Sequence, residues 1–210
     1  KWVKQFGYSG VDYINDLVVS NNSLYAVGGF QDSITFNSTT LYNNGTDIFI
    51  AKFDTSGNII WVRNLGCTGT TNSGNAITVD GDGNSYITGE VSGTASFGSF
   101  QITASNSSDM FLARYDSSGN CLGVKNFGQA SGSCLATDNA GDVTVAGTFS
   151  NTVTIGNNTF TSYGGKDVFL AKANAITGIE EERLSSNQLL IYANPNAGKC
   201  TITVPVEFAN

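Results

Sequence analysis

The 210-residue sequence contains no histidine, only two prolines and few charged residues. Histidine is the commonest general base and the commonest metal ligand, so its absence argues against most enzyme chemistry and most transition-metal sites. Charged residues make up 13% of the chain, whereas an average soluble protein has about 25%. Ten Lys and Arg residues and a net charge of −7 argue against a nucleic-acid partner, because affinity for phosphate comes from clustered basic side chains.

Long apolar runs and targeting features are also missing. No run of about 18 apolar residues occurs, so we expect no membrane span. The chain has no initiator methionine and no signal peptide, and it starts inside a repeat unit, so we interpret it as a processed product or a fragment. Its 25 glycines and many Ser, Thr and Asn residues are typical of short strands joined by tight turns. The composition therefore predicts an all-β fold.

One segment occurs twice in nearly the same form, at residues 47–66 and 109–128. A degraded copy opens at Asp167, and residues 2–7 match the tail of a further copy. A period of about 60 residues indicates a propeller, solenoid or array. The segment 48–53 is apolar on both faces, as the strands of stacked propeller blades must be.

These repeats predict about three four-stranded blades, the first beginning with a strand from Trp2 to Phe6. The C-terminal part differs in composition and carries the densest charge run of the chain. The predicted organisation is a β-propeller repeat region at 1–177, divided into units 2–60, 61–122 and 123–177, then a linker at 178–188 and a short β segment at 189–210.

The repeat pattern resembles a known family. It runs Trp, Phe-Gly, Asn-Ser-Tyr-Ile-Thr-Gly, Asp-x-Phe-Leu-Ala-Lys/Arg-Tyr/Phe-Asp-x-Ser-Gly-Asn, and then Trp again. This pattern resembles the bacterial β-propeller repeat of seven-bladed-propeller-type secreted proteins over residues 2–178. The third copy departs from it, because Gly123 replaces the repeat Trp and residues 173–175 replace the turn sequence. We interpret the third copy as a terminal, capping blade.

The C-terminal segment is similar to the opening of the carboxy-terminal sorting domain of type IX secretion cargo in Bacteroidetes. The match rests on Tyr192, Asn194, Pro195, Gly198 and Lys199, followed by the apolar strand 200–204. Ala193 stands where the family usually has a first proline, and the chain stops short of the full domain. The resemblance implies export by the type IX secretion machinery to the cell exterior or outer surface, through a signal that looks incomplete.

Repeated carboxylates are the first candidates for chemistry. Asp47, Asp109 and Asp167 occupy the same place in successive copies and could form a ring of acids for catalysis or calcium. A residue present in every unit is better explained as a side-chain cap on the turn before the strand. We therefore predict no catalytic residues and no cofactor.

A calcium loop is the second candidate, because Asp80, Asp82 and Asn84 have the Asp-x-Asp-x-Asn spacing of oxygen ligands. Position 12 of such a loop should be a bidentate Glu, but Val91 occupies it. We predict a plain glycine turn and keep calcium as the alternative.

The four cysteines show no Cys-x-x-Cys spacing, which argues against zinc. Cys121 and Cys200 occupy apolar strand positions, where we expect buried thiols. Cys67 and Cys134 open successive blades and could pair in an oxidising compartment.

Residues that break the repeat symmetry are the candidates for ligand binding. Tyr13, Tyr42 and Tyr163 could stack on sugar rings or contact a protein, although packing within the blades is the simpler explanation. The other symmetry-breaking residues are Tyr8, Phe30, Glu90 and Lys166.

Two functions follow from these observations. The first is a non-enzymatic extracellular structural or adhesive protein that associates with itself or with other surface proteins. The second is a glycan- or protein-binding propeller module of a larger secreted protein. A closed propeller has about four blades or more, so three units leave three possibilities open: further blades upstream, several chains completing a ring, or a head-to-tail filament.

Overall fold

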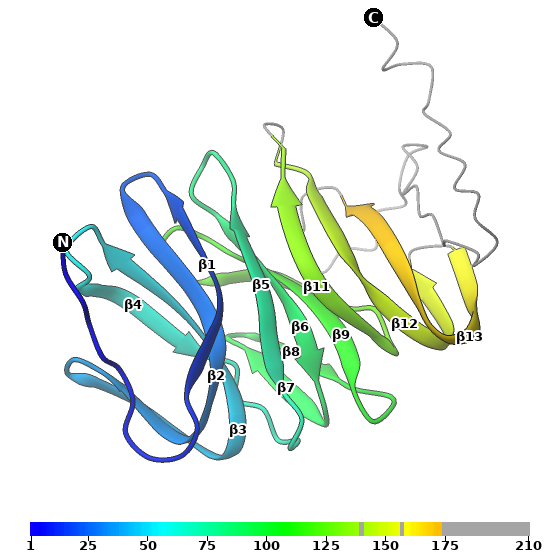
Figure 1. The fold of residues 1–210 in the computed structure, drawn as a ribbon, viewed down its shortest axis with the longest axis horizontal. Helices are drawn as coiled ribbons and strands as arrows, with labels where there is room; N and C mark the ends of the chain where they lie inside the picture. Colours follow the sequence, from blue (N-terminus) through cyan, green and yellow to red (C-terminus); the bar gives the residue numbers. More distant parts are fainter. Residues whose placement is uncertain (139–140, 156–157, 174–210) are drawn as a thin grey trace, which may run out of the picture.

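A computed structural model describes residues 1–138, 141–155 and 158–173. All regular elements in these ranges are β-strands, which confirms the all-β prediction. The strands form three successive sheets and a small ribbon, arranged like the leaves of a fan (Figure 1). Within the described ranges there is no helix with the length and apolarity needed to cross a bilayer. The predictions for 178–188 and 189–210 lie outside these ranges.

Blade 1 is a four-stranded antiparallel sheet in which the strands follow their sequence order. The turn between the first two strands is made by Asn21 and Asn22, whose φ angles of 49° and 55° suit asparagine better than most residues. The strands are β1 (Tyr13–Ser20), β2 (Ser23–Phe36), β3 (Thr39–Asp54) and β4 (Ile59–Asn64).

Blade 2 repeats this sheet and adds a separate two-stranded ribbon. In blade 1 the corresponding hairpin is continuous with β2 and β3, beyond an irregularity between Gln31 and Ser33. The blade 2 strands are β5 (Ser73–Val79), β6 (Ser85–Val91), β9 (Asp109–Tyr115) and β10 (Cys121–Asn126), and the ribbon is β7 (Thr94–Phe97) with β8 (Phe100–Thr103).

Blade 3 contains three strands among the described residues, β11 (Ala130–Thr137), β12 (Val143–Ile155) and β13 (Asn158–Ala173). The sheets are therefore offset by one strand from the predicted units 2–60, 61–122 and 123–177. The reason is that the Trp segment ends a sheet, since Trp61 lies in β4 and pairs with Lys52 of β3.

The predicted strand from Trp2 to Phe6 is wrong, because these residues form no strand in the structure. They are the sequence equivalent of Trp61–Leu65 in and after β4, a strand that needs a β3-like neighbour. In the structure the segment lies against blade 1, where Trp2 donates to the Thr55 carbonyl, and it belongs to no sheet.

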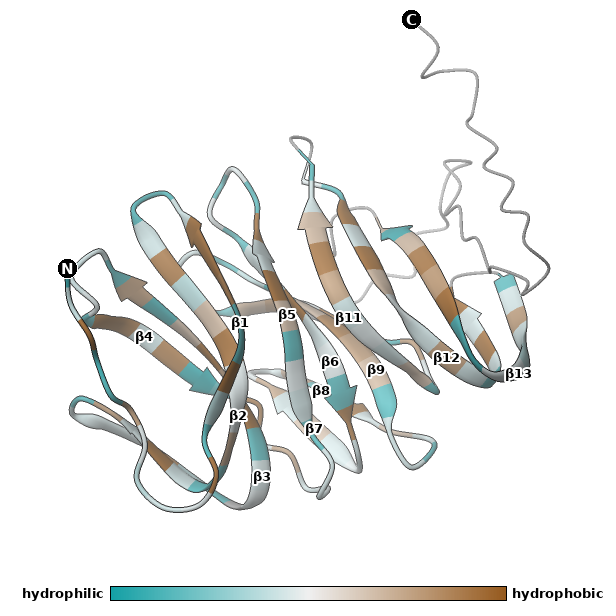
Figure 2. Ribbon diagram, in the orientation of Figure 1, coloured by the Kyte–Doolittle hydropathy of each residue, from teal (hydrophilic) through white to brown (hydrophobic). Residues whose placement is uncertain are grey.

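Apolar side chains pack between successive blades. We call the side of each blade that faces the preceding blade its front face, and the side that faces the following blade its back face. Tyr25, Val27 and Ile48 on the back of blade 1 pack in one cluster with Ile87 and Phe111 on the front of blade 2. Figure 2 shows the apolar stripes along the central strands. Burying one such side chain stabilises the fold by about 1.5–3 kcal/mol, so interblade packing is the main support of the sheet stack.

Candidate functional site

Two of the three repeated aspartates are fully buried and hold neighbouring loops in place. Asp47 accepts hydrogen bonds from the backbone N–H groups of Gly66 at 3.0 Å and Cys67 at 3.2 Å. It also accepts one from the Asn64 side-chain amide at 3.2 Å. These donors lie at and just after the end of β4, so Asp47, in the middle of β3, links this strand to the loop that enters the next blade. This geometry is that of a structural carboxylate.

Asp109 occupies the same place in blade 2. It accepts hydrogen bonds from the Ser105 N–H at 2.8 Å and from the Asn126 side-chain amide at 3.0 Å. Burial raises the pKa of Asp109, but its hydrogen bonds from Ser105, Asn126 and Asn106 outweigh burial, so the net pKa lies below the ordinary value. Asp167, half-buried in blade 3, accepts a bond from the Tyr163 N–H at 2.9 Å.

The proposed calcium ligands form a hydrogen-bonded turn. One Asp80 carboxylate oxygen accepts bonds from the backbone N–H groups of Asp82 at 3.1 Å and Asn84 at 2.8 Å. The other oxygen accepts from the Asn84 side-chain amide at 2.9 Å and the Tyr86 hydroxyl at 3.2 Å. The described residues contain no group of three or more His, Cys, Asp or Glu side chains that could hold a metal ion. Asp80 is thus engaged by its own turn, by Tyr86 of β6 and by Arg114 of β9.

The three cysteines in the described ranges are all free thiols. Cys67 is buried and Cys134 is exposed, so the structure does not show the disulfide considered between them. Burial raises the pKa of the Cys67 thiol far above its usual range, and burial raises that of Cys121 to about 11. Neither thiol has the lowered pKa of an activated nucleophile.

The repeat tryptophan joins neighbouring blades. The Trp61 indole N–H donates to the Ser117 carbonyl at 3.1 Å, in the turn of blade 2. Trp2 makes the equivalent bond to the Thr55 carbonyl at 2.8 Å, in the turn of blade 1. The Trp2 segment is therefore placed against blade 1 as β4 is placed against blade 2.

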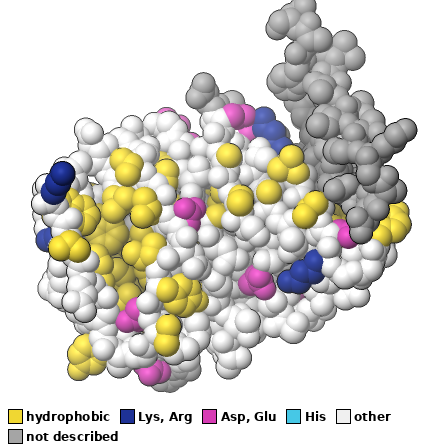
Figure 3. Space-filling view, in the orientation of Figure 1, with side chains coloured by type: hydrophobic (Ala, Val, Ile, Leu, Met, Phe, Trp, Pro, Cys, Tyr) yellow, Lys and Arg dark blue, Asp and Glu magenta, His cyan; other side chains and the backbone are white. Residues whose placement is uncertain are grey.

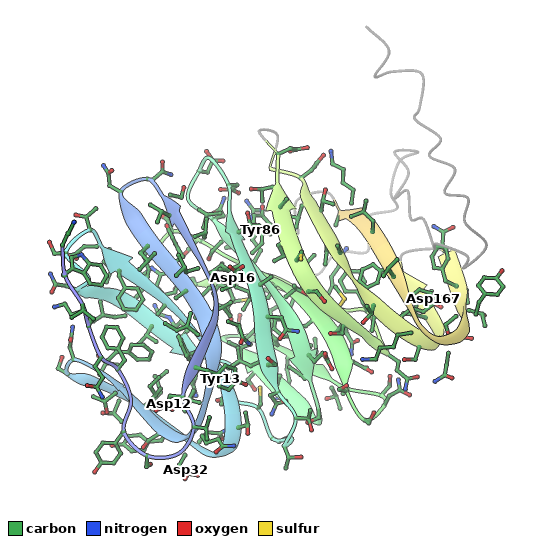
Figure 4. All side chains as sticks on the ribbon, in the orientation of Figure 1. Asp12, Tyr13, Asp16, Asp32, Tyr86 and Asp167 are labelled. Atoms are coloured by element: carbon green, nitrogen blue, oxygen red, sulfur yellow. The ribbon has the colours of Figure 1, made fainter. Side chains whose placement is uncertain are left out.

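The candidate tyrosines do not converge on one site. Tyr42 is 73% exposed and lies with Asp32, Ser33 and Asn43 around a shallow hollow of about 540 Å³ in blade 1. Tyr13 packs its hydroxyl against Gly29 instead. Figure 4 labels Tyr13 and Asp32 in blade 1, and Asp167 at the far end of the molecule, where exposed Tyr163 lies four residues away in β13.

Sequence reasoning missed Asp32, Ser33 and Asn43 beside Tyr42. The signal available was the polar sequence Gln-Asp-Ser at 31–33, which interrupts an apolar strand. Asp32 has a φ angle of +60°, a conformation that Asp tolerates better than most residues and that turns the strand at this point.

Apolar side chains are exposed at both ends of the blade stack. Ile14, Leu17 and Val19 project from the front of blade 1, and Val168 and Leu170 from the back of blade 3, each 47–71% exposed. Figure 3 shows hydrophobic side chains gathered over the blade 1 end. Sequence reasoning missed these faces, because residues of the same kind are buried in the inner blades.

Comparison with known proteins supports the repeat assignment. A family model described as a beta-propeller repeat matches residues 60–93. No curated protein matches the sequence. A crystal structure of a protein of unknown function from Bacteroides caccae is similar with a TM-score of 0.39 and 11% identity, over 85% of this chain. The chain spans 60% of that protein. Together with the strand arrangement, the repeat match confirms an all-β fold built of β-propeller-type repeats.

Proposed function

We propose that the chain is a non-enzymatic structural or adhesive repeat protein of the cell exterior or outer surface, which acts by associating with itself. Export by the type IX route is part of this proposal and rests on the resemblance of residues 189–210 to a sorting domain. The proposed function involves neither binding to nucleic acid nor a membrane-spanning segment.

One observation carries self-association: apolar side chains are exposed at both ends of the blade stack, whereas their equivalents between blades are buried. Leu17 is 56% exposed, but its equivalent Ile77 in blade 2 is only 4% exposed. Leu170 is 47% exposed, but Ile50 and Leu112 at the same place are fully buried. Exposed apolar patches of this kind mark protein interaction sites. The repeated aspartates accept structural hydrogen bonds, so they do not support a catalytic role. The exposed apolar side chains support a role in association.

Light scattering of the purified 210-residue chain, across a wide range of protein concentrations, tests this proposal. The expected result is a mass above 22.0 kDa that rises with concentration. A chain that stays monomeric at every concentration would contradict self-association and would shift attention to other ligands.

A binding module is the second candidate, and the hollow around Tyr42 favours it. An exposed aromatic ring beside Asp32, Ser33 and Asn43 combines a stacking surface with polar groups, as glycan sites do. Isothermal titration with a glycan panel would test this function. Binding that is lost in Tyr42→Ala and kept in Tyr163→Ala would support it, since Tyr163 is equally exposed but lies in blade 3.

A further inference from the structure

We propose that a second copy of this chain adds its residues 2–7 as a fourth strand beside β13, the edge strand of blade 3 among the described residues. This inference rests on the proposed self-association and names the surfaces that carry it. The copies then associate head to tail, with the back of blade 3 of one copy covering the front of blade 1 of the other.

The first argument is that, among the described residues, blade 3 has one strand fewer than blades 1 and 2, while residues 2–7 have the sequence of a fourth strand and belong to no sheet. Blades 1 and 2 have four strands, and blade 3 has three among the described residues, with β13 at its edge. The segment Trp2-Val-Lys-Gln-Phe-Gly7 matches Trp61–Gly66 in sequence but belongs to no sheet. An unpaired edge strand readily accepts another strand by backbone hydrogen bonding.

The sequence that aligns with the fourth strand is acidic in blade 3. In the repeat alignment, Ile60, Trp61 and Val62 of β4 correspond to Glu180, Glu181 and Glu182. Three adjacent carboxylates would repel one another on a strand that is apolar in blade 1, and glutamate is depleted in strands. A strand supplied by another copy avoids this conflict.

The register of the inner blades fixes the pairing. In blade 1, Ala51 opposes Val62, and in blade 2 Ala113 opposes Val124. The same register places Ala171 opposite Val3 of the second copy. Val3 is 92% exposed, although Val62 is only 8% exposed, so the added strand buries a side chain that the single chain leaves in water.

The added strand also offers the side-chain hydrogen bond that the central aspartate accepts in blades 1 and 2. In blades 1 and 2 the central aspartate accepts a bond from a fourth-strand amide, Asn64 to Asp47 and Asn126 to Asp109. Among the described residues no fourth-strand amide reaches Asp167. Gln5 occupies the place of Asn64 in the repeat, so Gln5 of the second copy supplies the amide that no described fourth strand gives to Asp167.

The added strand also determines which blade faces meet, because residues 2–7 already lie against the front of blade 1. Trp2 donates to the Thr55 carbonyl as Trp61 donates to Ser117. Phe6 packs against Phe36 with ring centroids 5.1 Å apart. A sheet that grows from this segment therefore lies over the front of blade 1. The N-terminus and β13 are at opposite ends of the fan, so one copy does not join them (Figure 1).

Side-chain sizes are complementary across this contact. Between blades 1 and 2, a Cβ on Gly74 would lie 2.5 Å from a Val27 methyl carbon, so only glycine fits. Ile14 replaces this glycine in blade 1, and Ala146 replaces Val27 in blade 3. The larger residue on one face thus meets the smaller residue on the other. Two copies contribute six blades, which lies within the range of about four to eight blades in closed propellers.

Light scattering of single variants tests the interface. Val3→Glu and Leu170→Glu place a charge at exposed positions of the single chain, so each should fold but raise the dissociation constant about 30-fold or more. Ile60→Glu is the control, because Ile60 is 53% exposed and lies in none of the apolar clusters. The wild-type mass should be at least twice 22.0 kDa; a dimer indicates a closed ring and a larger species an open filament.

Disulfide trapping tests the register. A chain carrying Val3→Cys is mixed with a chain carrying Ala171→Cys, both in a Cys134→Ser background, and oxidised. We expect a cross-link between copies, located by peptide mass spectrometry. Lys172→Cys replaces Ala171→Cys in the control, because successive side chains of a strand point to opposite faces.

The outcomes separate this interface from self-association in general. A chain that associates, but is insensitive to Val3→Glu and Leu170→Glu and forms no cross-link, would overturn the strand exchange and leave the proposed function standing. A monomeric wild-type chain would overturn both, and would assign the end faces to residues 174–210 or to a different protein.

Discussion

At the scale of single residues, buried aspartates organise each blade. Asp109 is fully buried, and its carboxylate accepts bonds from the Ser105 N–H and the Asn126 side chain at 2.8 and 3.0 Å. We expect Asp109→Asn to reduce the free energy of unfolding by about 1–3 kcal/mol at neutral pH, because buried donors lose a charged acceptor. Denaturant titration followed by circular dichroism would measure this loss.

We also expect the destabilisation by Asp109→Asn to depend on pH. The pKa of Asp109 is lowered in the folded chain, so its contribution is fully present above the unfolded pKa of about 4 and is lost as pH falls through the lower folded value. The stability difference between wild type and Asp109→Asn should therefore shrink in acid. Asp82→Asn, at an exposed residue, is the matched control; an equal loss in both variants would contradict the assignment.

The sequence identified these aspartates as structural because they recur at Asp47 and Asp109. It predicted caps on the turn before the strand, whereas Asp47 lies within β3 and accepts bonds from Gly66 and Cys67 in the loop after β4. It did not reveal Asp16, which accepts a bond from the Ile77 N–H of blade 2 at 2.9 Å. Asp16 has no counterpart in the other repeats, where Ala76 and Cys134 occupy its place. Repetition identifies residues that act in every blade, but not a contact that occurs once.

At the scale of elements, Trp61 in the last strand of blade 1 contacts a turn of blade 2 and so joins the two blades. A Cβ on Gly119 would lie 2.7 Å from a ring carbon of Trp61, and Gly119 has a φ angle of +81°. We expect Gly119→Ala to destabilise the chain by about 1–3 kcal/mol, because the side chain meets both ring contact and backbone strain. Thermal unfolding monitored by tryptophan fluorescence would measure it.

Gly81→Ala provides the comparison for this element. Gly81 also lies in a turn of blade 2, but nothing lies within 4 Å of the position of its Cβ. Its substitution should change the unfolding temperature little. If both variants lowered the unfolding temperature equally, the destabilisation would come from reduced turn flexibility and not from the contact with Trp61.

The sequence predicted the strands of the repeat but placed the sheet boundaries one strand early. A repeat can be divided at any point of its period, and backbone pairing decides which strand ends a sheet. Trp61 pairs with Lys52 of β3, so the tryptophan segment closes blade 1 and does not open blade 2. The segment at Trp2 has the right sequence for a strand but lacks a partner, and local sequence does not report on partners.

At the scale of the whole molecule, stacked blades predict uneven local stability. Each blade contacts its neighbours alone, as in other repeat proteins. Blade 2 is covered on both sides, and Tyr86, Met110 and Leu112 on its back face are fully buried. Within the part of the chain that the structure describes, blade 3 is covered on one side, with Val168 and Leu170 about half exposed. The sequence could predict the stacking but not which faces stay uncovered.

Hydrogen exchange with mass spectrometry would test this gradient, with Val3→Glu used to keep the chain monomeric. Amides of β6 and β9 should exchange slowest, because opening blade 2 disrupts two apolar interfaces, and amides of β13 should exchange faster because opening blade 3 disrupts one. In the associated wild type, β13 should become protected, since its edge gains a partner strand. Uniform exchange across the blades would contradict the layered stability, and unchanged β13 exchange on association would place the contact elsewhere.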